Sequence, residues 1–393
     1  MEQNLHRQIC EDIASRGGRA LLVGGCVRDM LTGVAPQDID CEVHDLAPDV
    51  LYALLSRYGE VDKSGEPFGV FTLKEQDFDF ALPRIERRTG SAHTDFEITP
   101  IPNLSPKAAA ARRDFTVNAI MMDALTGEVI DPYGGAEDLK RGVLRVVPGG
   151  QFQEDPLRVL RGAQFAARFF LWPEEETLSL MRQMPLGDLS AQRVLSETKK
   201  ALLHAERPGV YLSVLGAADA LTPWFKALSG EEALSHAAEM LDRAAKLRSR
   251  AKEPLLFMLA AMTHGLDEKA ADALLTGLGV SKSGVAYCES LSARQKDMHL
   301  GRAHASLVFD RCVCPADLAL FCAACGESEA VMAERLRAYE AAVSRPMPTG
   351  RMLVEAGVKP GPHMKRMVEA ARNLALLGMD AESAVQRMIK ETK

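Results

Sequence analysis

Two carboxylates one residue apart, shortly after a pair of glycines, could do chemistry on a nucleotide. Residues 21–29 read LLVGGCVRD, and residues 37–40 read QDID. If the second segment is a strand, Asp38 and Asp40 point to the same side, because strand side chains alternate between faces. The glycines allow backbone N–H groups to approach a ligand where the following helix begins. Carboxylates for a divalent ion and amides for phosphate indicate a nucleoside-triphosphate site.

Clustered carboxylates suit nucleotidyl transfer, in which a hydroxyl attacks an α-phosphorus in line and pyrophosphate leaves. Two metal ions can stabilise the attacking and leaving oxygens of such a displacement. We predict Asp38 and Asp40 as catalytic residues and as ligands of Mg²⁺. Asp79, in the strand-like segment 78–82 (FDFAL), is the predicted third catalytic carboxylate. The alternative for Asp79 is an ordinary carboxylate on the surface of a strand.

Three more blocks follow in order along the chain. Residues 111–120 read ARRDFTVNAI, residues 131–135 read DPYGG, and residues 154–161 read EDPLRVLR. Together with the first motif, they resemble the class II template-independent nucleotidyltransferases, which comprise the CCA-adding tRNA nucleotidyltransferases and the bacterial poly(A) polymerases. The four blocks extend over about 150 residues, and the rest of the chain resembles the helical body of the family more loosely.

The resemblance implies an α+β fold: an N-terminal mixed α/β nucleotidyltransferase head of the DNA polymerase beta-like type, followed by an all-helical neck and body. The residue pattern agrees, because strand signals nearly vanish after about residue 155. We expect a head domain at 1–145, a neck with the nucleotide-selecting motif at 146–225, and a tRNA-binding body and tail at 226–393. In the head, the pattern predicts helices near 3–16, 26–32 and 48–58, and strands near 19–24, 38–43, 69–74 and 77–82. Residues 84–106 lack a clear period and read as a loop.

The resemblance also implies nucleotide-binding residues. Gly25 lies in the glycine turn, Arg28 is placed for a phosphate contact, and Arg113 is assigned to the incoming nucleotide. We expect Asp29 to fix the helix or Arg28, and Asp114 and Asn118 to hydrogen-bond the turn between head and neck. Arg112 is compatible with either role.

The block at 154–161 predicts a protein template for base selection. Asp155, Arg158 and Arg161, the remaining predicted nucleotide-binding residues, would share one face of a helix. A carboxylate accepts from the exocyclic amine of cytosine or adenine, and an arginine donates to the neighbouring ring nitrogen. Uracil and guanine present a carbonyl instead. The alternative is an i,i+3 salt bridge on a helix surface. Gln164 stands where the family often has a further arginine.

Size and composition indicate a soluble cytoplasmic protein. The 393 residues are 47% hydrophobic and 26% charged, and the longest apolar run, at 255–262, is too short to cross a bilayer. The N-terminus lacks a signal-peptide pattern. The net charge of −7 argues against coating of nucleic acid, although it allows a local basic face. We expect such a positive cleft from arginines in the first 170 residues: Arg84, Arg87, Arg88, Arg112, Arg113, Arg158, Arg161 and Arg168. The alternative for Arg84, Arg87 and Arg88 individually is a scattered, solvated surface arginine.

Two groups of residues in the second half of the chain could bind a metal ion, but the residues around each group argue against it. Cysteines at 312, 314, 322 and 325 could hold zinc, but residues 315–324 read as an apolar helix that would bury the thiols. His236 and His264 lie in a degenerate HD-like region around 236–265, where some relatives have a metal phosphohydrolase domain. The bridging aspartate would fall at Gly265, so we predict no phosphohydrolase activity.

These observations favour a CCA-adding enzyme that binds the tRNA 3′ end and adds C, C and A from CTP and ATP without a nucleic-acid template. Alternatives are a poly(A) polymerase, an enzyme that adds part of the triplet, and, from another class, a catalytically silent RNA-binding protein. The set of charged residues at the predicted site argues against the silent protein.

Overall fold

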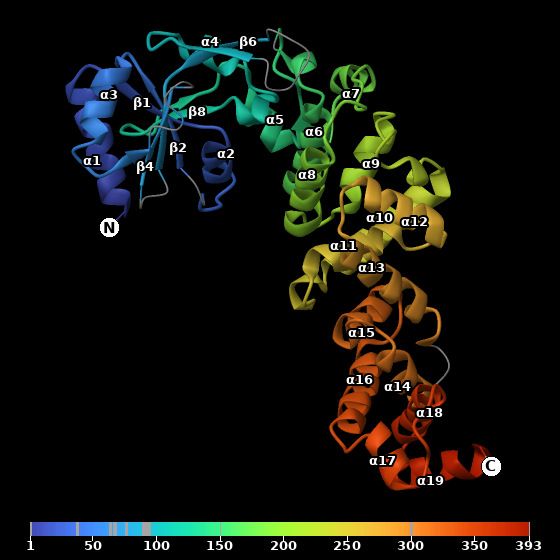
Figure 1. Cartoon of the computed structure of the whole chain (residues 1–393). Helices are drawn as coiled ribbons and strands as arrows, with labels where there is room; N and C mark the ends of the chain where they lie inside the picture. Colours follow the sequence, from blue (N-terminus) through green and yellow to red (C-terminus); the bar gives the residue numbers. More distant parts are fainter. Residues whose placement is uncertain are drawn as a thin grey trace. The chain divides into compact units, whose positions relative to one another are not determined.

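A mixed β-sheet organises the amino-terminal part of the computed structural model (Figure 1). The structure describes residues 2–36, 39–62, 65, 69–74, 78–88, 96–149, 151–298 and 302–392. Within these residues, seven strands form the sheet in the order β3-β4-β5-β2-β1-β8-β9. They are β1 (Arg19–Val23), β2 (Ile39–His44), β3 (Val61–Asp62), β4 (Val70–Leu73), β5 (Phe78–Ala81), β8 (Met121–Asp123) and β9 (Val129–Ile130). Strands β2 and β5 are parallel, and the other neighbours are antiparallel.

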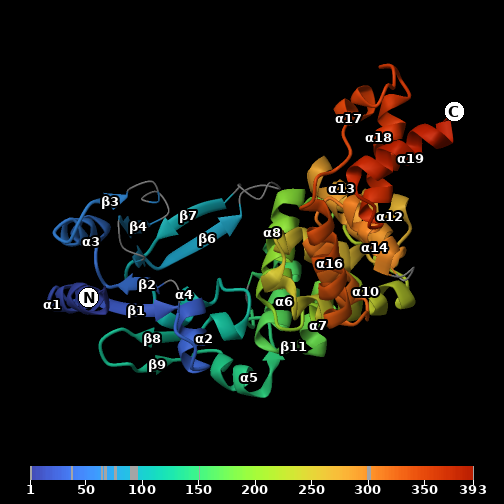
Figure 2. The same cartoon turned by 90° about the horizontal axis from the view of Figure 1, so that it is seen from below.

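The two faces of this sheet differ in character. Helices α1 (Glu2–Ser15) and α3 (Pro48–Leu55) pack on the face that carries Cys41 and Phe80, and they bury a continuous apolar core there (Figures 1 and 2). Asp40 lies on the opposite face, because neighbouring strand residues alternate. Helix α2 (Gly25–Leu31) follows β1 directly, and α4 (Pro106–Ala110) packs against residues of β1 and β8. The sheet therefore has one sealed face and one that carries polar groups.

Most elements predicted for the head are confirmed. The helices predicted near 3–16, 26–32 and 48–58 correspond to α1, α2 and α3, and the four predicted strands correspond to β1, β2, β4 and β5. The loop predicted at 84–106 is partly wrong. Strands β6 (Arg84–Arg88) and β7 (Phe96–Pro100) pair antiparallel there, and Arg84 is opposite Pro100. Strand β6 (RIERR) has a single apolar residue, so the alternation that would predict a strand is missing there.

The block at 131–135 forms the start of a helix. Asp131 accepts from the backbone N–H groups of Gly135 (2.8 Å) and Ala136 (2.9 Å) at the beginning of α5 (Gly135–Arg141). A Cβ on Gly135 would collide with the carbonyl oxygen of Thr116. The aspartate and the second glycine of this motif are therefore explained by helix capping and close backbone packing.

The helix that begins within the block at 154–161 packs tightly on Phe115. Phe115 meets the rings of Phe152 and Phe165 edge to face, at 5.7 and 6.0 Å between ring centres. A Cβ on Gly162, in α6 (Leu157–Phe169), would lie 2.8 Å from the Phe115 ring. Only a residue without a side chain lets helix and ring approach this closely. The amino-terminal unit also contains β10 (Val143–Leu144), β11 (Trp172–Pro173) and α7 (Glu175–Arg182).

The chain forms two compact units, Met1–Leu189 with Ala217–Ala220 and Ser190–Gly216 with Leu221–Lys393. The division into three domains at 145 and 225 stays a prediction. In the described part of the second unit the regular elements are helices, as the residue pattern predicted. They are α8 (Ala191–His204), α9 (Gly209–Ala217), α10 (Glu231–Ala245), α11 (Pro254–Thr263), α12 (Glu268–Gly277), α13 (Lys282–Gln295), α14 (Arg302–Asp310), α15 (Pro315–Ala324), α16 (Glu329–Val343), α17 (Gly350–Glu355), α18 (Met364–Leu376) and α19 (Ala381–Thr392).

A buried carboxylate ties helices of the second unit together. Asp317 is fully buried on α15, and it accepts from the backbone N–H groups of Lys252 (2.9 Å) and Glu253 (3.2 Å) and from the Tyr287 hydroxyl. These donors offset the cost of removing the carboxylate from water. The helix at 315–324 is confirmed, and Cys322 is buried on it.

Candidate nucleotide-transfer site

The predicted catalytic carboxylates lie on neighbouring strands. Asp40 of β2 is exposed and is paired in parallel register with Asp79 of β5. Paired residues of adjacent strands point to the same side, with backbones about 4.8 Å apart. The Thr72 hydroxyl donates to Asp79 Oδ1 at 2.6 Å and so orients that carboxylate. The fold thus brings together two aspartates that are 39 positions apart in the sequence. Asp38 lies outside the described residues.

A second carboxylate on β2 was missed by the sequence interpretation. Glu42 points to the same face as Asp40 but is buried. Its Oε2 accepts from Arg112 Nη2 at 3.2 Å, and its Oε1 is 3.0 Å from His44 Nε2. Burial alone would raise the pKa of Glu42, but the hydrogen bond from His44 and the charges of Arg113 and Arg112 outweigh it and lower the pKa to about 2. An acidic residue at every second position from 38 to 42 was the available signal.

The glycine turn is shaped around two guanidinium groups. Gly24 has a φ of +72°, and a Cβ there would lie 3.3 Å from Arg113 Nη1. A Cβ on Gly25 would lie 3.5 Å from Arg28 Nη2. Burial and the neighbouring Arg112 lower the pKa of Arg113, against the opposing charges of Glu42, Asp114 and Asp40. Even with that shift Arg113 stays protonated at neutral pH, because arginine ordinarily loses its proton only above pH 12. A cation is therefore held beside the glycine turn, where a phosphate would be attracted.

Arg28 itself is fixed by several partners. It is buried, its Nη1 donates to Asn118 Oδ1 at 2.8 Å, and its guanidinium lies 3.7 Å from the centre of the Phe169 ring. Asp29 Oδ1 accepts from Nε at 3.1 Å and from Nη2 at 2.9 Å. The interpretation of Asp29 as the residue that fixes Arg28 is confirmed. The predicted phosphate contact of Arg28 stays a prediction.

Asp114 joins the turn after α4 to helix α6. Its Oδ1 accepts from the Phe115 N–H at 2.9 Å and from Asn118 Nδ2 at 3.0 Å. Its Oδ2 accepts from Arg161 Nε at 2.8 Å and Nη2 at 2.7 Å. Burial alone would raise the pKa of Asp114, but Arg161 and Asn118 outweigh it and lower the pKa. Asp114 and Asn118 hydrogen-bond this turn, as predicted, whereas its place between head and neck stays a prediction. Arg161 points at a structural carboxylate.

Asp155 and Arg158 are close in sequence but differ in backbone setting. Asp155 is extended (φ −131°, ψ 107°) and precedes α6, so the shared helix face predicted for it is wrong. The cause is Pro156, since the residue before a proline is disfavoured in the helical region. Asp155 Oδ1 accepts from the Leu157 N–H at 3.0 Å. Arg158 Nη2 donates to the Arg112 carbonyl oxygen at 3.1 Å. Its Nη1 is buried and has no hydrogen-bonding partner among the described residues.

The two histidines of the second unit face each other. His236 Nε2 is 2.8 Å from His264 Nδ1, and His264 Nε2 is 3.6 Å from Cys325 Sγ. Burial and the neighbouring His236 lower the pKa of His264. Gly265 has a φ of +93°, and a Cβ there would lie 2.8 Å from His236 Cδ2. The backbone thus leaves no room for a carboxylate at the position where a metal-bridging aspartate would stand.

Comparisons with known proteins show similarity in the head and over most of the chain. Residues 20–145 match the family described as "Poly A polymerase head domain". The "Multifunctional CCA protein" of Actinobacillus pleuropneumoniae serotype 5b is 36% identical over 299 residues, which cover 70% of each chain. The "CCA-adding enzyme" of Alteromonas mediterranea is 39% identical over 239 residues, covering 59% of this chain and 58% of the relative.

Solved structures show the same fold. The Thermotoga maritima CCA-adding enzyme complexed with tRNA superposes with a TM-score of 0.72 at 20% identity, covering 99% of this chain and 95% of that chain. The Bacillus stearothermophilus CCA-adding enzyme in complex with CTP gives 0.73 at 21% identity, covering 99% and 97%.

Fold and site together define a nucleotidyltransferase whose mixed head is followed by a helical unit. The chain belongs to the family of CCA-adding enzymes, as the sequence motifs predicted. No helix within the described residues is both long and apolar enough to span a membrane.

Proposed function

We propose that this chain adds C, C and A to the 3′ end of tRNA from CTP and ATP without a nucleic-acid template. The observation that carries the proposal is the parallel register of Asp40 with Asp79 on the polar face of the sheet, beside a glycine turn that holds Arg113. Family membership supports the choice of substrate, because relatives at 36–39% identity are named for CCA addition.

The proposed catalytic residues are Asp40 and Asp79 on the described strands, with Asp38 as a third. Oxygen ligands of this kind suit Mg²⁺, and two carboxylates on one side of adjacent strands fit a divalent ion. When bound, Mg²⁺ would supply the charge that stabilises the attacking and leaving oxygens. The chain's own contribution is positioning: Thr72 orients Asp79, and Arg113 holds positive charge beside the turn.

Base selection is proposed for Asp155 and Arg158, with Gly25, Arg28 and Arg113 toward the phosphates. Arg158 supports this role because its buried Nη1 has no partner in the described part of the chain, and buried donors are nearly always paired. Its other terminal nitrogen is anchored on the Arg112 carbonyl, which leaves Nη1 as the donor for a ring nitrogen. The Leu157 N–H holds the Asp155 carboxylate at the start of α6, where it would accept an exocyclic amine.

Arg161 enters the proposal as a positioning residue. It is hydrogen-bonded to Asp114, which also accepts from the Asn118 amide. Loss of Arg161 would leave a buried carboxylate without its charged partner, and the start of α6 would no longer be tied to the turn. Its influence on the nucleotide would then pass through Asp155 and Arg158.

The tRNA is proposed to bind mainly through shape and phosphate contacts, as expected for duplex RNA. The net charge of −7 makes local placement of basic residues decisive. We also propose that the protein acts in the cytoplasm, which its eight free thiols support. Binding to several unrelated tRNAs should weaken steeply with salt. Strong preference for one tRNA sequence, with little salt effect, would contradict the proposal.

The decisive experiment is nucleotide addition to labelled tRNA that lacks its 3′ CCA, resolved on a sequencing gel. We expect two additions with CTP alone and three with CTP plus ATP. Long A tails from ATP alone would instead favour a poly(A) polymerase. Addition of C alone, or of A alone, would favour an enzyme that adds part of the triplet. No addition by the folded protein in Mg²⁺, on any of several tRNAs, would favour the silent RNA-binding protein.

A further inference from the structure

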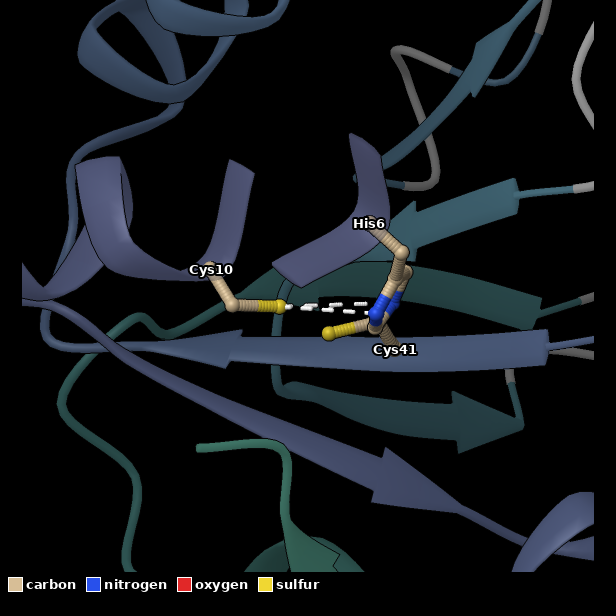
Figure 3. Close-up of side chains that lie close together, drawn as sticks. All are labelled: His6, Cys10 and Cys41. Carbon is tan, nitrogen blue, oxygen red and sulfur yellow. Dashed lines mark hydrogen bonds between the residues drawn. The ribbon is translucent and has the colours of Figure 1, made fainter. Parts of the chain in front are cut away.

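A histidine and two cysteines meet in the core of the head, on the sealed face of the sheet. His6 and Cys10 are one turn apart on α1, and Cys41 lies on β2 (Figure 3). One donor atom from each of the three side chains lies within 4.8 Å of the others. All three residues are buried, with exposed fractions of 8%, 0% and 1%. Cys41 follows Asp40 directly, so the cluster and the catalytic carboxylates lie on opposite faces of one strand.

The surroundings of His6 are unusual for a buried imidazole. Its ring is held edge-on to Phe78 and stacked with Phe80, at 5.0 and 5.9 Å between ring centres. The Cys10 sulfur lies 3.7 Å from Nδ1 and 4.0 Å from Nε2, and it is the hydrogen-bonding partner that the described residues offer to this ring. A thiol is a weak partner, whereas buried polar nitrogens usually have a strong one. The ring therefore lies beside the sulfur while its hydrogen-bonding capacity is poorly used.

We propose that His6, Cys10 and Cys41 bind a divalent thiophilic metal ion, with Zn²⁺ as the chemical type. Two cysteines and one histidine are a ligand set that zinc uses, with a fourth position left for another donor. Charge decides between candidate ions. Two thiolates and a neutral imidazole balance a divalent cation, whereas Cu⁺ would leave a net negative charge in the core. Binding releases the two thiol protons to solvent.

The distances require a small adjustment. Bond lengths of about 2.0–2.3 Å place donors of a tetrahedral site about 3.5–3.8 Å apart. Donors that already lie within 4.8 Å must approach by about 1 Å, which side-chain rotation on α1 can supply. The bound ion would join α1 to β2 and so stabilise the head. It would not compete for the carboxylates on the other face, which prefer a hard ion such as Mg²⁺.

The test is an anaerobic titration of the full chain with Co²⁺, a coloured substitute for Zn²⁺. We expect one equivalent of Co²⁺ to give thiolate charge-transfer and tetrahedral ligand-field bands, and one equivalent of Zn²⁺ to bleach them. Cys10→Ser and Cys41→Ser should each weaken binding by about a hundredfold or more, because each removes a ligand. Cys288→Ser is the matched control: it removes a thiol that is equally buried, in the other unit, and should leave the bands intact.

Two further measurements keep the test independent of variant folding and of the nucleotide site. X-ray absorption of the Zn²⁺-loaded wild-type chain should show two sulfur ligands and the signature of one imidazole. Asp40→Asn should keep the Co²⁺ bands, since it lies outside the cluster. The proposal is overturned by a zinc shell of oxygen and nitrogen alone, by bands that persist in Cys10→Ser, or by failure of the wild-type chain to bind a stoichiometric equivalent.

Discussion

The head sheet and the helical unit each carry potential metal-binding side chains, and the two sets differ in how they are arranged. On the head sheet, Asp40 and Asp79 point to the same side from neighbouring strands, and Asp40 is exposed. In the helical unit, His236 and His264 turn ring nitrogens toward each other at 2.8 Å. The two carboxylates are exposed to solvent, whereas the two imidazoles are hydrogen-bonded to each other.

The supporting residues explain the difference. Beside the carboxylates, a glycine turn makes room for Arg113, and buried Glu42 holds Arg112. Beside the histidines, Gly265 has a φ of +93°, and a larger residue there would strain the backbone and collide with His236. Ligand types alone therefore do not define a site: the neighbours must leave donors available and supply opposite charge.

Loss of the strand carboxylate should produce the largest effect. Asp40→Asn removes a proposed metal ligand without disturbing the core, since Asp40 is exposed. We expect CCA addition to fall by about a thousandfold or more, which corresponds to several kcal/mol of transition-state stabilisation. Single-turnover addition to labelled tRNA measures it. Asp49→Asn, an exposed aspartate on α3, is the control and should keep full activity. Appreciable transfer by Asp40→Asn would refute the catalytic assignment.

Protonation of Glu42 should lower the stability of the head at acid pH. Its folded pKa of about 2 lies below the ordinary value of 4.5. A lowered carboxyl pKa contributes stability that is present above pH 4.5 and is lost as the pH falls toward 2, and the shift corresponds to about 3 kcal/mol. Urea unfolding of the head should therefore show Glu42→Gln to be less stable at pH 7, with the gap to wild type closing by about pH 2–3.

The matched control for this pH profile is Glu11→Gln, which alters the exposed pair with Arg7 and should leave the profile unchanged. A gap between wild type and Glu42→Gln that stays constant from pH 7 to pH 2 would show that the carboxylate is not stabilised by His44 and the arginines.

Asp155→Ala should change nucleotide choice. Removal of the acceptor weakens C and A addition and ends the repulsion of carbonyl-bearing bases, so discrimination should fall by about 1–3 kcal/mol. Primer-extension gels with single nucleotides should then show U or G incorporation. Arg158→Ala should slow both C and A addition. Gln153→Ala, an exposed neighbour, should behave as wild type. Unchanged selectivity in Asp155→Ala would reduce Asp155 to a helix cap.

Substitution of Gly265 should lower the stability of the helical unit and leave CCA addition unchanged. Gly265→Ala places a Cβ 2.8 Å from His236 Cδ2 at a φ of +93°, and should destabilise the helical unit by about 1–2 kcal/mol. Gly277→Ala, whose Cβ would meet open space at the end of α12, is the control and should not lower the unfolding temperature. Both variants should keep CCA addition. Wild type should release no phosphate from 2′,3′-cyclic nucleotides in Ni²⁺ or Mn²⁺; release that disappears in His264→Ala would contradict this.

The sequence interpretation succeeded where a local pattern determines geometry. Alternation along β2 and the glycine turn after β1 follow from short-range rules, and those elements are confirmed. It failed at Asp155. The prediction placed Asp155 on one helix face with Arg158 and Arg161, but Pro156 makes the helix begin after Asp155. It also missed β6 and β7, because their pairing depends on contacts across the hairpin.

By itself, the sequence determined the family, the mixed head and the order of the motifs at 21–40, 111–120 and 154–161, because these depend on residue type and spacing over a few positions. Only the tertiary structure decided which distant groups meet. It paired Asp79 with Asp40, bound Arg161 to Asp114, and buried Glu42 behind the arginines. Strand register and helix packing are set by the whole core, where burial decides which polar groups must pair.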